Sequence, residues 1–220
     1  MVIDLAKYRV IDLSCELLPG ERKIDGRYLH GKPLHGRPVE VQEFMAYAAR
    51  MHFIQGQTHT GTHAEAPYKY SETAADIGSM PVESFLGEAA ACDFSGKKAG
   101  EPVTAEDFQR AGVTTGDIVL AWGGQETLSD PPYMTAEATG WLIETKIKLL
   151  GIENLRFSPP GVPFGPDYAD ARLLAGGVAL VDAVQGLNQI KRNRVFFIAL
   201  PTKLRRVTAA WTRAVALEEI

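Results

Sequence analysis

The stretch Gln57-Thr58-His59-Thr60-Gly61-Thr62-His63-Ala64-Glu65-Ala66-Pro67 places two imidazoles and one carboxylate close together in the chain. Neutral imidazole and carboxylate form a ligand set that suits zinc, manganese or iron. The sequence contains five His, and none follows His63. A site that needs imidazole must therefore be built in this stretch, or beside it with His30, His35 and His52.

The separation of His59 and His63 restricts the backbone conformations that could bring both rings to one ion. A fully extended strand would hold them roughly 13 Å apart, too far for two ligands that each lie about 2 Å from the same metal. A helix would bring them together, but the intervening Thr-Gly-Thr is a poor helix former. We therefore expect a turn at Gly61, where positive φ is allowed, to aim both rings and Glu65 at one point. The alternative is that the pair arises by chance and the rings only satisfy backbone groups.

Length and composition predict one globular domain that spans residues 1–220. The 220 residues suffice for a sizeable core, and 45% hydrophobic with 23% charged residues is ordinary globular composition. A net charge of −4 argues against nucleic acid as a partner. No apolar run approaches the ~20 residues of a membrane span, so no membrane partner is expected.

The two cysteines, Cys15 and Cys92, are far apart and form neither a Cys-x-x-Cys pair nor a disulfide framework. We expect both to lie in strands as small buried apolar residues, which fits a reducing compartment. The N-terminal residues include Asp4 and Lys7 and lack the apolar core of a signal peptide. A soluble, cytoplasmic protein is therefore predicted.

Strand and helix signals alternate along the chain. Ser79 is expected to cap a helix that starts within 80–86. Thr104 is expected to cap a second helix, and Gly112 to end it. Gly151 is expected to end a long amphipathic helix. Two clear helices are predicted over 104–112 and 135–149, and residues 169–175 are a further candidate helix. Strands are predicted over 10–13, 89–94, 117–122, 178–182, 195–201 and 214–217, and a long loop over 19–38. This alternation predicts an α/β fold, layered as β/β/α, with a mixed sheet.

Six stretches, in order along nearly the whole chain, resemble the landmarks of a known family: residues 9–14, 59–67, 112–120, 140–152, 173–178 and 197–204. On these stretches the chain is identified as a member of the cyclase family, which includes bacterial kynurenine formamidase, isatin hydrolase and proteins of polyketide biosynthesis. The resemblance implies a swivelling-type β/β/α domain that assembles into homodimers or homotetramers. It also implies a small-molecule substrate, and a metal that activates water against an amide, lactam or lactone carbonyl.

The resemblance assigns the metal ligands to particular positions of this chain. Two imidazoles and one carboxylate hold the ion in the family, and these fall on His59, His63 and Glu65. A further carboxylate ligand, usually Glu in the family, falls on Asp182. The family usually has Asp where this chain has Glu65, so the ion or the backbone would shift by about the length of one methylene.

Two further departures concern charge. Lys69 and Asp170 stand where the family has His. A permanent cation at Lys69 disfavours a second divalent ion, and Asp170 and Asp182 would pair with that ammonium group instead. We therefore expect one divalent ion per chain, zinc or manganese, or none, rather than two. The simpler interpretations are that Lys69 is a solvated surface lysine and that Asp170 caps a helix.

The primary hypothesis is a metal-dependent hydrolase in which proton transfer falls to Lys69, Glu65 or Asp170. A lysine does this near neutral pH only when its pKa is depressed. One alternative is a cyclase, isomerase or lyase that uses Lys69 as electrophile or proton donor. Another is a family member that has lost catalysis and binds a small ligand or a partner. Four aromatic residues could line a substrate pocket, with core packing the favoured interpretation for the first two: Phe53, Trp122, Phe157 and Phe164.

Overall fold

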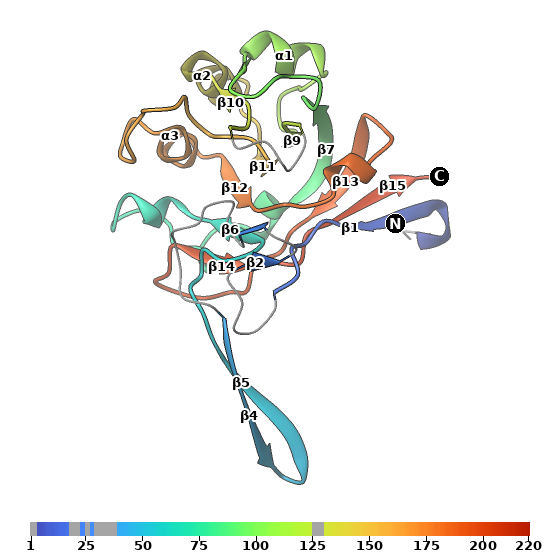
Figure 1. Ribbon diagram of the computed structural model, residues 1–220, viewed down its shortest axis with the longest axis vertical. Coiled ribbons are helices and arrows are strands. Elements are labelled where there is room, and N and C mark those ends of the chain that lie inside the picture. Colours follow the sequence, from blue (N-terminus) through green and yellow to red (C-terminus); the bar gives the residue numbers. More distant parts are fainter. Residues whose placement is uncertain (1–3, 18–22, 25–26, 29–38, 125–129) are drawn as a thin grey trace.

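The computed structural model describes residues 4–17, 23–24, 27–28, 39–124 and 130–220, and its main body is a curled nine-stranded sheet (Figure 1). In spatial order the strands are β1 (Tyr8–Asp12), β15 (Val215–Glu219), β13 (Arg194–Ile198), β7 (Leu86–Asp93), β9 (Ile118–Trp122), β11 (Leu149–Glu153), β12 (Ala179–Asp182), β6 (His63–Glu65) and β14 (Ala209–Trp211). Neighbours from β7 to β12 are parallel, and the other pairs in this sheet are antiparallel. The predicted α/β class with a mixed sheet is confirmed.

Side chains alternate along the central strands, and this gives the sheet two apolar faces. In β9, Ile118, Leu120 and Trp122 belong to one buried cluster, whereas Val119 and Ala121 belong to a second. The first cluster is built from strands, loops and short 3-10 helices, and the second lies between the sheet and the α-helices. The two clusters therefore form a β/β layer and a β/α layer, as the sequence predicts.

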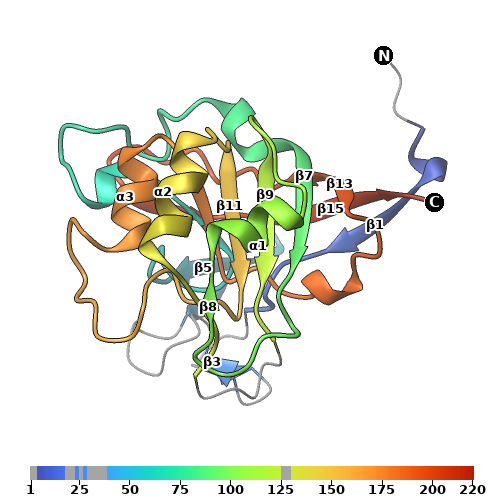
Figure 2. The same cartoon turned by 90° about the horizontal axis from the view of Figure 1, so that it is seen from above.

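Three α-helices cover the second face: α1 (Ala105–Arg110), α2 (Ala136–Glu144) and α3 (Ala169–Ala175) (Figure 2). The N-cap predicted at Thr104 is confirmed, and Asp107 completes a capping box with it. The Thr104 hydroxyl accepts the backbone N–H of Asp107, and the Asp107 carboxylate accepts the backbone N–H of Thr104. Helix α3 begins and ends where the sequence predicts.

The single long helix predicted over 135–149 is wrong in its C-terminal third. Helix α2 ends at Glu144, and Lys146 adopts a φ of 58° in the left-handed region, where helices commonly stop. The chain then enters β11 at Leu149, and Gly151 lies inside that strand. A short apolar run fits a buried strand as well as a helix, and pairing between β9 and β12 selects the strand.

The remaining elements are short. They are the 3-10 helices η1 (Leu5–Lys7), η2 (Pro67–Lys69), η3 (Val82–Phe85) and η4 (Leu187–Gln189), and the paired strands β10 (Tyr133–Met134) with β8 (Pro102–Val103), β2 (Lys23–Ile24) with β3 (Arg27–Tyr28), and β4 (Glu40–Ala46) with β5 (Ala49–Gln55). The predicted cap at Ser79 is wrong, because η3 begins after Pro81 and the Ser79 hydroxyl donates to Asp76 instead. Most of the loop predicted over 19–38 lies outside the described residues. Within the described part of the chain, every helix is too short or too polar to cross a membrane.

The prediction for the cysteines is half right. Cys92 lies in β7 and is fully buried, and burial raises the pKa of its thiol to about 12. Cys15 lies outside the strands and is only partly buried. Its backbone N–H donates to the Thr62 hydroxyl over 2.7 Å.

Glu218 in β15 is a buried carboxylate whose charge the backbone stabilises. It accepts the N–H groups of Lys191 and Arg192 and pairs with the guanidinium of Arg9. Burial alone would raise its pKa, but these hydrogen bonds and the charge of Arg9 outweigh burial and lower the pKa of Glu218 below its ordinary 4.5. The resulting stabilisation is complete above the ordinary pKa and is lost as the pH falls through the depressed one.

We expect Glu218→Gln to lower the free energy of unfolding by about 1–3 kcal/mol at pH 7. The difference from wild type should shrink as the pH falls below about 4, because the wild-type carboxyl also becomes neutral. Urea unfolding at a series of pH values measures this. Glu219→Gln, which changes the exposed neighbour, is the control and should have little effect at any pH. A Glu218→Gln deficit that is the same at pH 3 as at pH 7 would contradict the assignment.

Candidate metal centre

The predicted turn at Gly61 is present and brings the imidazole pair together. Gly61 has a φ of 64°, and a Cβ there would lie 2.5 Å from the Leu17 side chain, so both backbone conformation and space require glycine. Strand β6 follows at once. Alternate residues of a strand share a face, so His63 and Glu65 point the same way while Ala64 packs into the β/β core.

Strand β6 is held on both sides by neighbouring strands. Asp182 of β12 and Trp211 of β14 lie opposite His63 in the two ladders. The Thr62 hydroxyl, just before β6, donates to the carbonyl of Ala183 over 2.7 Å. The rigid sheet therefore fixes the backbone that carries His63 and Glu65, and both side chains are almost completely buried.

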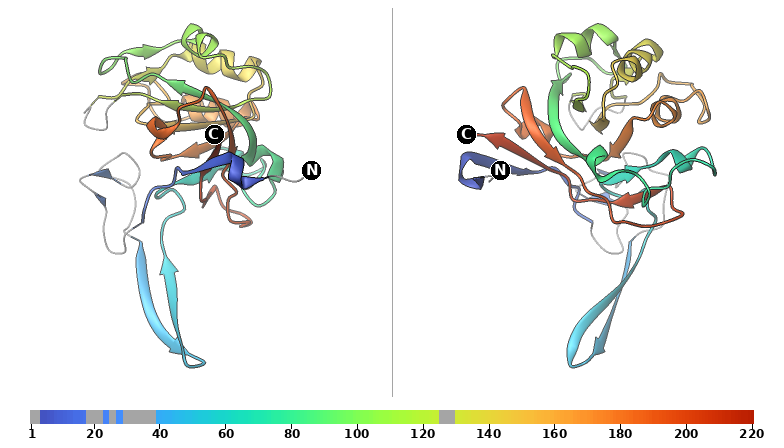
Figure 3. Two further views of the ribbon diagram at one scale, coloured as in Figure 1. Left: turned by 90° about the vertical axis from the view of Figure 1, so that its right-hand side faces the viewer. Right: turned by 180° about the vertical axis from the view of Figure 1, so that it is seen from behind.

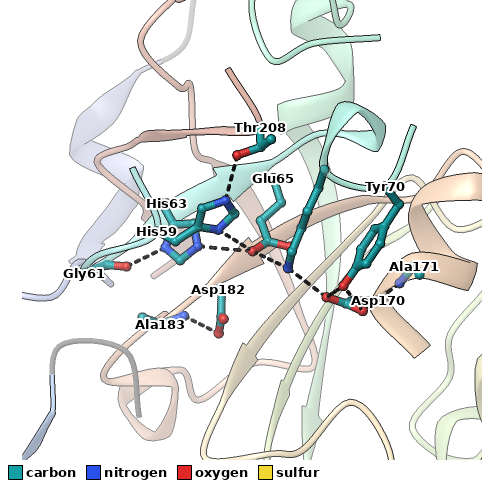
Figure 4. Close-up of polar contacts among 11 residues, drawn as sticks. His59, Gly61, His63, Glu65, Tyr70, Asp170, Ala171, Asp182, Ala183 and Thr208 are labelled. Atoms are coloured by element: carbon teal, nitrogen blue, oxygen red, sulfur yellow. Dashed lines mark hydrogen bonds and ion pairs between the residues drawn. The ribbon is translucent and has the colours of Figure 1, made fainter. Parts of the chain in front are cut away.

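Three potential ligand atoms converge at this point. Nδ1 of His59 lies 2.8 Å and Nε2 of His63 lies 3.3 Å from the same oxygen, Oε1 of Glu65. The two rings meet edge to face with centroids 5.0 Å apart. The ligand atoms of the three residues all lie within 4.8 Å of one another (Figure 4). This is the convergence that the sequence predicts from the turn.

The outer nitrogen of each imidazole also has a partner. Nε2 of His59 lies 2.8 Å from the Thr208 hydroxyl, and Nδ1 of His63 lies 2.8 Å from the carbonyl of Gly61. A carbonyl can only accept, so Nδ1 of His63 carries a proton, and it is Nε2 that faces the Glu65 carboxylate. Partners of this kind orient imidazole ligands in metal sites. Two oriented imidazoles and a carboxylate fit a divalent ion such as zinc or manganese.

Lys69 lies on the other side of Glu65. Its ammonium group is 3.0 and 2.9 Å from the two carboxylate oxygens of Glu65 and 2.8 Å from Oδ2 of Asp170. The predicted ion pair between Lys69 and Asp170 is therefore confirmed, and the interpretation of Lys69 as a solvated lysine is wrong. Its side chain is 25% exposed, and those of its partners are 2% and 3% exposed.

Asp170 is held in turn by its own surroundings. The Tyr70 hydroxyl lies 2.9 and 2.8 Å from its two oxygens, and the backbone N–H of Ala171 donates to Oδ1 over 2.7 Å (Figure 4). Asp170 lies inside the first turn of α3, which is capped by Tyr168, so it is not the N-cap that the simpler interpretation proposed. Burial raises the pKa of Tyr70, so its hydroxyl stays protonated as the donor to Asp170.

The electrostatics of the cluster favour the charged forms of Glu65, His63 and Lys69. Burial opposes the charge on Glu65, but hydrogen bonds from His59 and His63 and the charge of Lys69 hold its pKa well below 4.5. Burial likewise opposes a charge on His63, yet Glu65 and Asp182 raise its pKa above 6.5. For Lys69, the carboxylates outweigh burial and raise the pKa. This is the reverse of the depressed pKa that a proton-transferring lysine needs.

Asp182, the remaining predicted ligand, lies next to this cluster. Asp182 stands beside His63 and acts on it through its charge, while its Oδ1 accepts the backbone N–H of Ala183 over 2.7 Å. Its role as a ligand stays a prediction.

Sequence reasoning missed Tyr70 and Thr208. Tyr70 adjoins Lys69 in the chain and could have been considered, whereas Thr208 is 149 residues from His59 and carries no local signal.

Of the four aromatic residues proposed for a substrate pocket, two pack in or against the core and two are exposed. Trp122 is buried in the core as expected, and Phe157 packs against the second apolar cluster. Phe53 is exposed on β5, so its assignment to the core is wrong, because that strand lies outside the main sheet. Phe164 is exposed and contacts Tyr168, with ring centroids 4.6 Å apart.

The chain belongs to the cyclase family, described as "Putative cyclase", which its residues 11–159 match. A kynurenine formamidase of Erythrobacter litoralis is 29% identical over 171 residues, covering 73% of this chain and 74% of that protein. Isatin hydrolase A of Labrenzia aggregata, solved with benzyl benzoate, has the same fold, with a TM-score of 0.80 at 22% identity over 98% of this chain and 95% of that one. A potential metal-dependent hydrolase with cyclase activity gives a TM-score of 0.72 at 19% identity over 97% and 99%. Taken together, these similarities indicate a hydrolase.

Proposed function

We propose that this chain hydrolyses an amide, lactam or lactone bond of a small aromatic molecule and uses one divalent ion held by His59, His63 and Glu65. The observation that carries the proposal is the convergence of their ligand atoms within 4.8 Å, next to the lysine. A bound ion of this kind supplies Lewis-acid polarisation of a carbonyl and acidification of water. The similarity to a kynurenine formamidase and to an isatin hydrolase supports the reaction class.

Lys69 acts in this proposal as a fixed hydrogen-bond donor. Its three N–H bonds already serve Glu65 and Asp170, and its raised pKa keeps the ammonium group charged. Since its side chain is partly exposed, an oxygen of the substrate could replace one of the Glu65 oxygens as the acceptor of an N–H bond. Proton abstraction by Lys69 is disfavoured, and Asp170 acts as a positioning residue because Tyr70 and the helix backbone already occupy its oxygens.

An aromatic pair near the cluster, the exposed Phe164 and the partly buried Tyr168, supports an aromatic substrate. Tyr168 immediately precedes α3, the helix that carries Asp170. Burial raises the pKa of the Tyr168 phenol. The charges of Asp170 and Lys69 also act on this pKa, so Tyr168 lies within electrostatic range of the Lys69–Asp170 ion pair. Phe164 lies against Tyr168, and together they offer an apolar surface on which a ring could pack.

Turnover of three compounds tests the proposal: N-formylkynurenine, isatin and a simple aromatic lactone. The protein is first freed of metal with a chelator and is then supplied with Zn²⁺ or Mn²⁺. We expect turnover of at least one compound only with the ion. Mass spectrometry should then show a ring-opened product that has gained one water from isatin or the lactone, or kynurenine and formate from N-formylkynurenine. A product of unchanged mass would instead support the alternative isomerase or cyclase chemistry, in which Lys69 donates to an enolate. Equal turnover in the presence of chelator would contradict the metal-dependent reaction.

A further inference from the structure

Trp211 is the last residue of β14 and lies beside the candidate metal centre. In the ladder between β6 and β14 it stands directly opposite His63, and directly paired residues of antiparallel strands carry their side chains on the same face. The ladder between β6 and β12 places Asp182 opposite His63 on the other side. The side chains of Trp211, His63 and Asp182 therefore form one row across three strands. This face of β6 also carries Glu65.

The neighbouring pair of the same ladder supports this assignment of faces. Ala64 and Ala210 lie opposite each other, and both pack into the β/β core. Because side chains alternate along a strand, Trp211 points away from that core, to the side on which His63 and Glu65 meet. Opposite residues have Cβ atoms roughly 5 Å apart, so a molecule bound at an ion on His63 would lie within reach of the indole.

The indole N–H of Trp211 is a hydrogen-bond donor without an acceptor. Its Nε1 atom is buried, and none of the residues that the structure describes accepts a hydrogen bond from it. A buried donor without a partner is unfavourable, and native proteins contain few of them. The Thr212 hydroxyl is also buried and unpartnered, but it belongs to the next residue, which alternation directs to the other face. Trp211 thus offers an unused donor on the face of the metal centre.

The edge of the ring that carries Nε1 lies against an exposed segment of the chain. A Cβ on Gly56 would lie 2.9 Å from Cζ2 and 3.1 Å from Cη2 of Trp211, so the absence of a side chain at Gly56 makes room for the ring. Gly56 follows the β4–β5 hairpin, which projects from the body (Figures 1 and 3), and precedes the turn that carries His59. Since Gly56 is itself exposed, a small displacement of this segment opens a path from solvent to the N–H.

We propose that Trp211 determines the specificity of the site by donating its indole N–H to an oxygen of the ligand while its ring packs against the ligand. The ligand is then a small ring compound that carries a carbonyl or carboxylate oxygen besides the bond that is hydrolysed. Because the N–H is shielded from water, it gains more from a partner there than an exposed donor would. The inference rests on the proposed function for the place where the ligand binds.

Nuclear magnetic resonance of protein with ¹⁵N-labelled tryptophan tests the hydrogen bond without relying on turnover. The chain contains three Trp, so three indole N–H signals are expected, and Trp211→Phe identifies one of them by its loss. The probes are formanilide, ortho-acetylformanilide and ortho-formamidobenzoate, which share a ring and a formamide. The second adds a ketone oxygen, and the third adds a carboxylate.

Each probe is added in the presence of chelator and again with Zn²⁺, where hydrolysis would leave the added oxygen on the aniline product. We expect the ketone probe, the carboxylate probe or both to move the Trp211 indole proton downfield, as a new hydrogen bond does. Formanilide should leave it near its free position. The probe that moves the signal further shows which kind of oxygen the site prefers.

Titration calorimetry with the same probes measures the contribution to affinity. The wild-type protein should bind the preferred probe roughly 10-fold more tightly than formanilide. Trp211→Phe keeps an aromatic ring and loses the N–H, so it should bind the two about equally. Trp141→Phe is the matched control, because Trp141 packs against the second apolar cluster, and it should keep the wild-type preference. Thermal unfolding verifies the fold of each variant.

Several results would overturn the proposal. One is a Trp211 indole signal that no probe moves. Another is a Trp211→Phe variant that keeps the preference, or that loses affinity for all three probes equally, since the ring would then act only as an apolar wall. Loss of the preference in Trp141→Phe also overturns it. Failure of the proposed reaction is distinguishable, because the probes would then bind and move the signal while none is hydrolysed with Zn²⁺ or Mn²⁺.

Discussion

His63→Ala is expected to remove metal binding and hydrolysis together. His63 is fully buried, its Nε2 faces the Glu65 carboxylate, and its Nδ1 is fixed by the carbonyl of Gly61. A divalent ion contributes several kcal/mol to stabilising the transition state, so its loss should lower kcat/KM by about 10³-fold or more. Elemental analysis of the purified variant, together with the assay on the best substrate, measures both effects.

Two further variants separate chemistry from folding in this experiment. His63→Gln keeps most of the side-chain volume in the sheet and should lose the ion as well, while its thermal unfolding stays close to that of wild type. Thr208→Val removes only the hydroxyl partner of His59 and is expected to weaken metal binding or activity by about 10–100-fold. Retained turnover in His63→Ala would rule out the metal-dependent mechanism, whatever the state of its fold.

Lys69→Met is expected to destabilise the metal-free protein by about 3–5 kcal/mol. The substitution leaves Glu65 and Asp170, both nearly fully buried, without the cation that they share. Removing one partner of a buried ion pair leaves the remaining charge buried without a partner, and this costs about 3–5 kcal/mol. Denaturant unfolding in the presence of chelator measures the loss, and Lys69→Met/Asp170→Asn should recover part of it by removing one of the stranded charges.

The same substitution tests whether Lys69 limits the number of ions. We expect one equivalent of zinc or manganese per wild-type chain. Added metal should stabilise Lys69→Met more than wild type, because the positive ion can then neutralise the two carboxylates in place of the missing ammonium group. Lys97→Met is the control: Lys97 also pairs with two carboxylates, but its partner Glu101 is exposed, so the loss should be smaller and insensitive to metal. Two equivalents bound to the wild-type chain would contradict the single-ion site.

The elements that were predicted correctly depend on neighbours in the chain. The capping box of α1 needs only Thr104 and Asp107, and the turn before β6 needs only Gly61 and its tolerance of positive φ. The predicted helix runs past Glu144 because the apolar Ile147, Leu149 and Leu150 fit a helix as well as a buried strand. Only pairing with β9 and β12 distinguishes the two conformations. Short-range preferences are decisive where one conformation alone satisfies them, and ambiguous elsewhere.

The sequence by itself determined the imidazole pair, its turn and the carboxylate on the same face of β6, since all three lie within one short stretch. It also supported the pairing of Lys69 with Asp170 through the charges of the two residues. Only the tertiary structure decided that Lys69 bridges two buried carboxylates and is held as an ammonium group. The charge state of a buried group depends on everything packed around it, and here Asp170 comes from a helix 101 residues away in the chain.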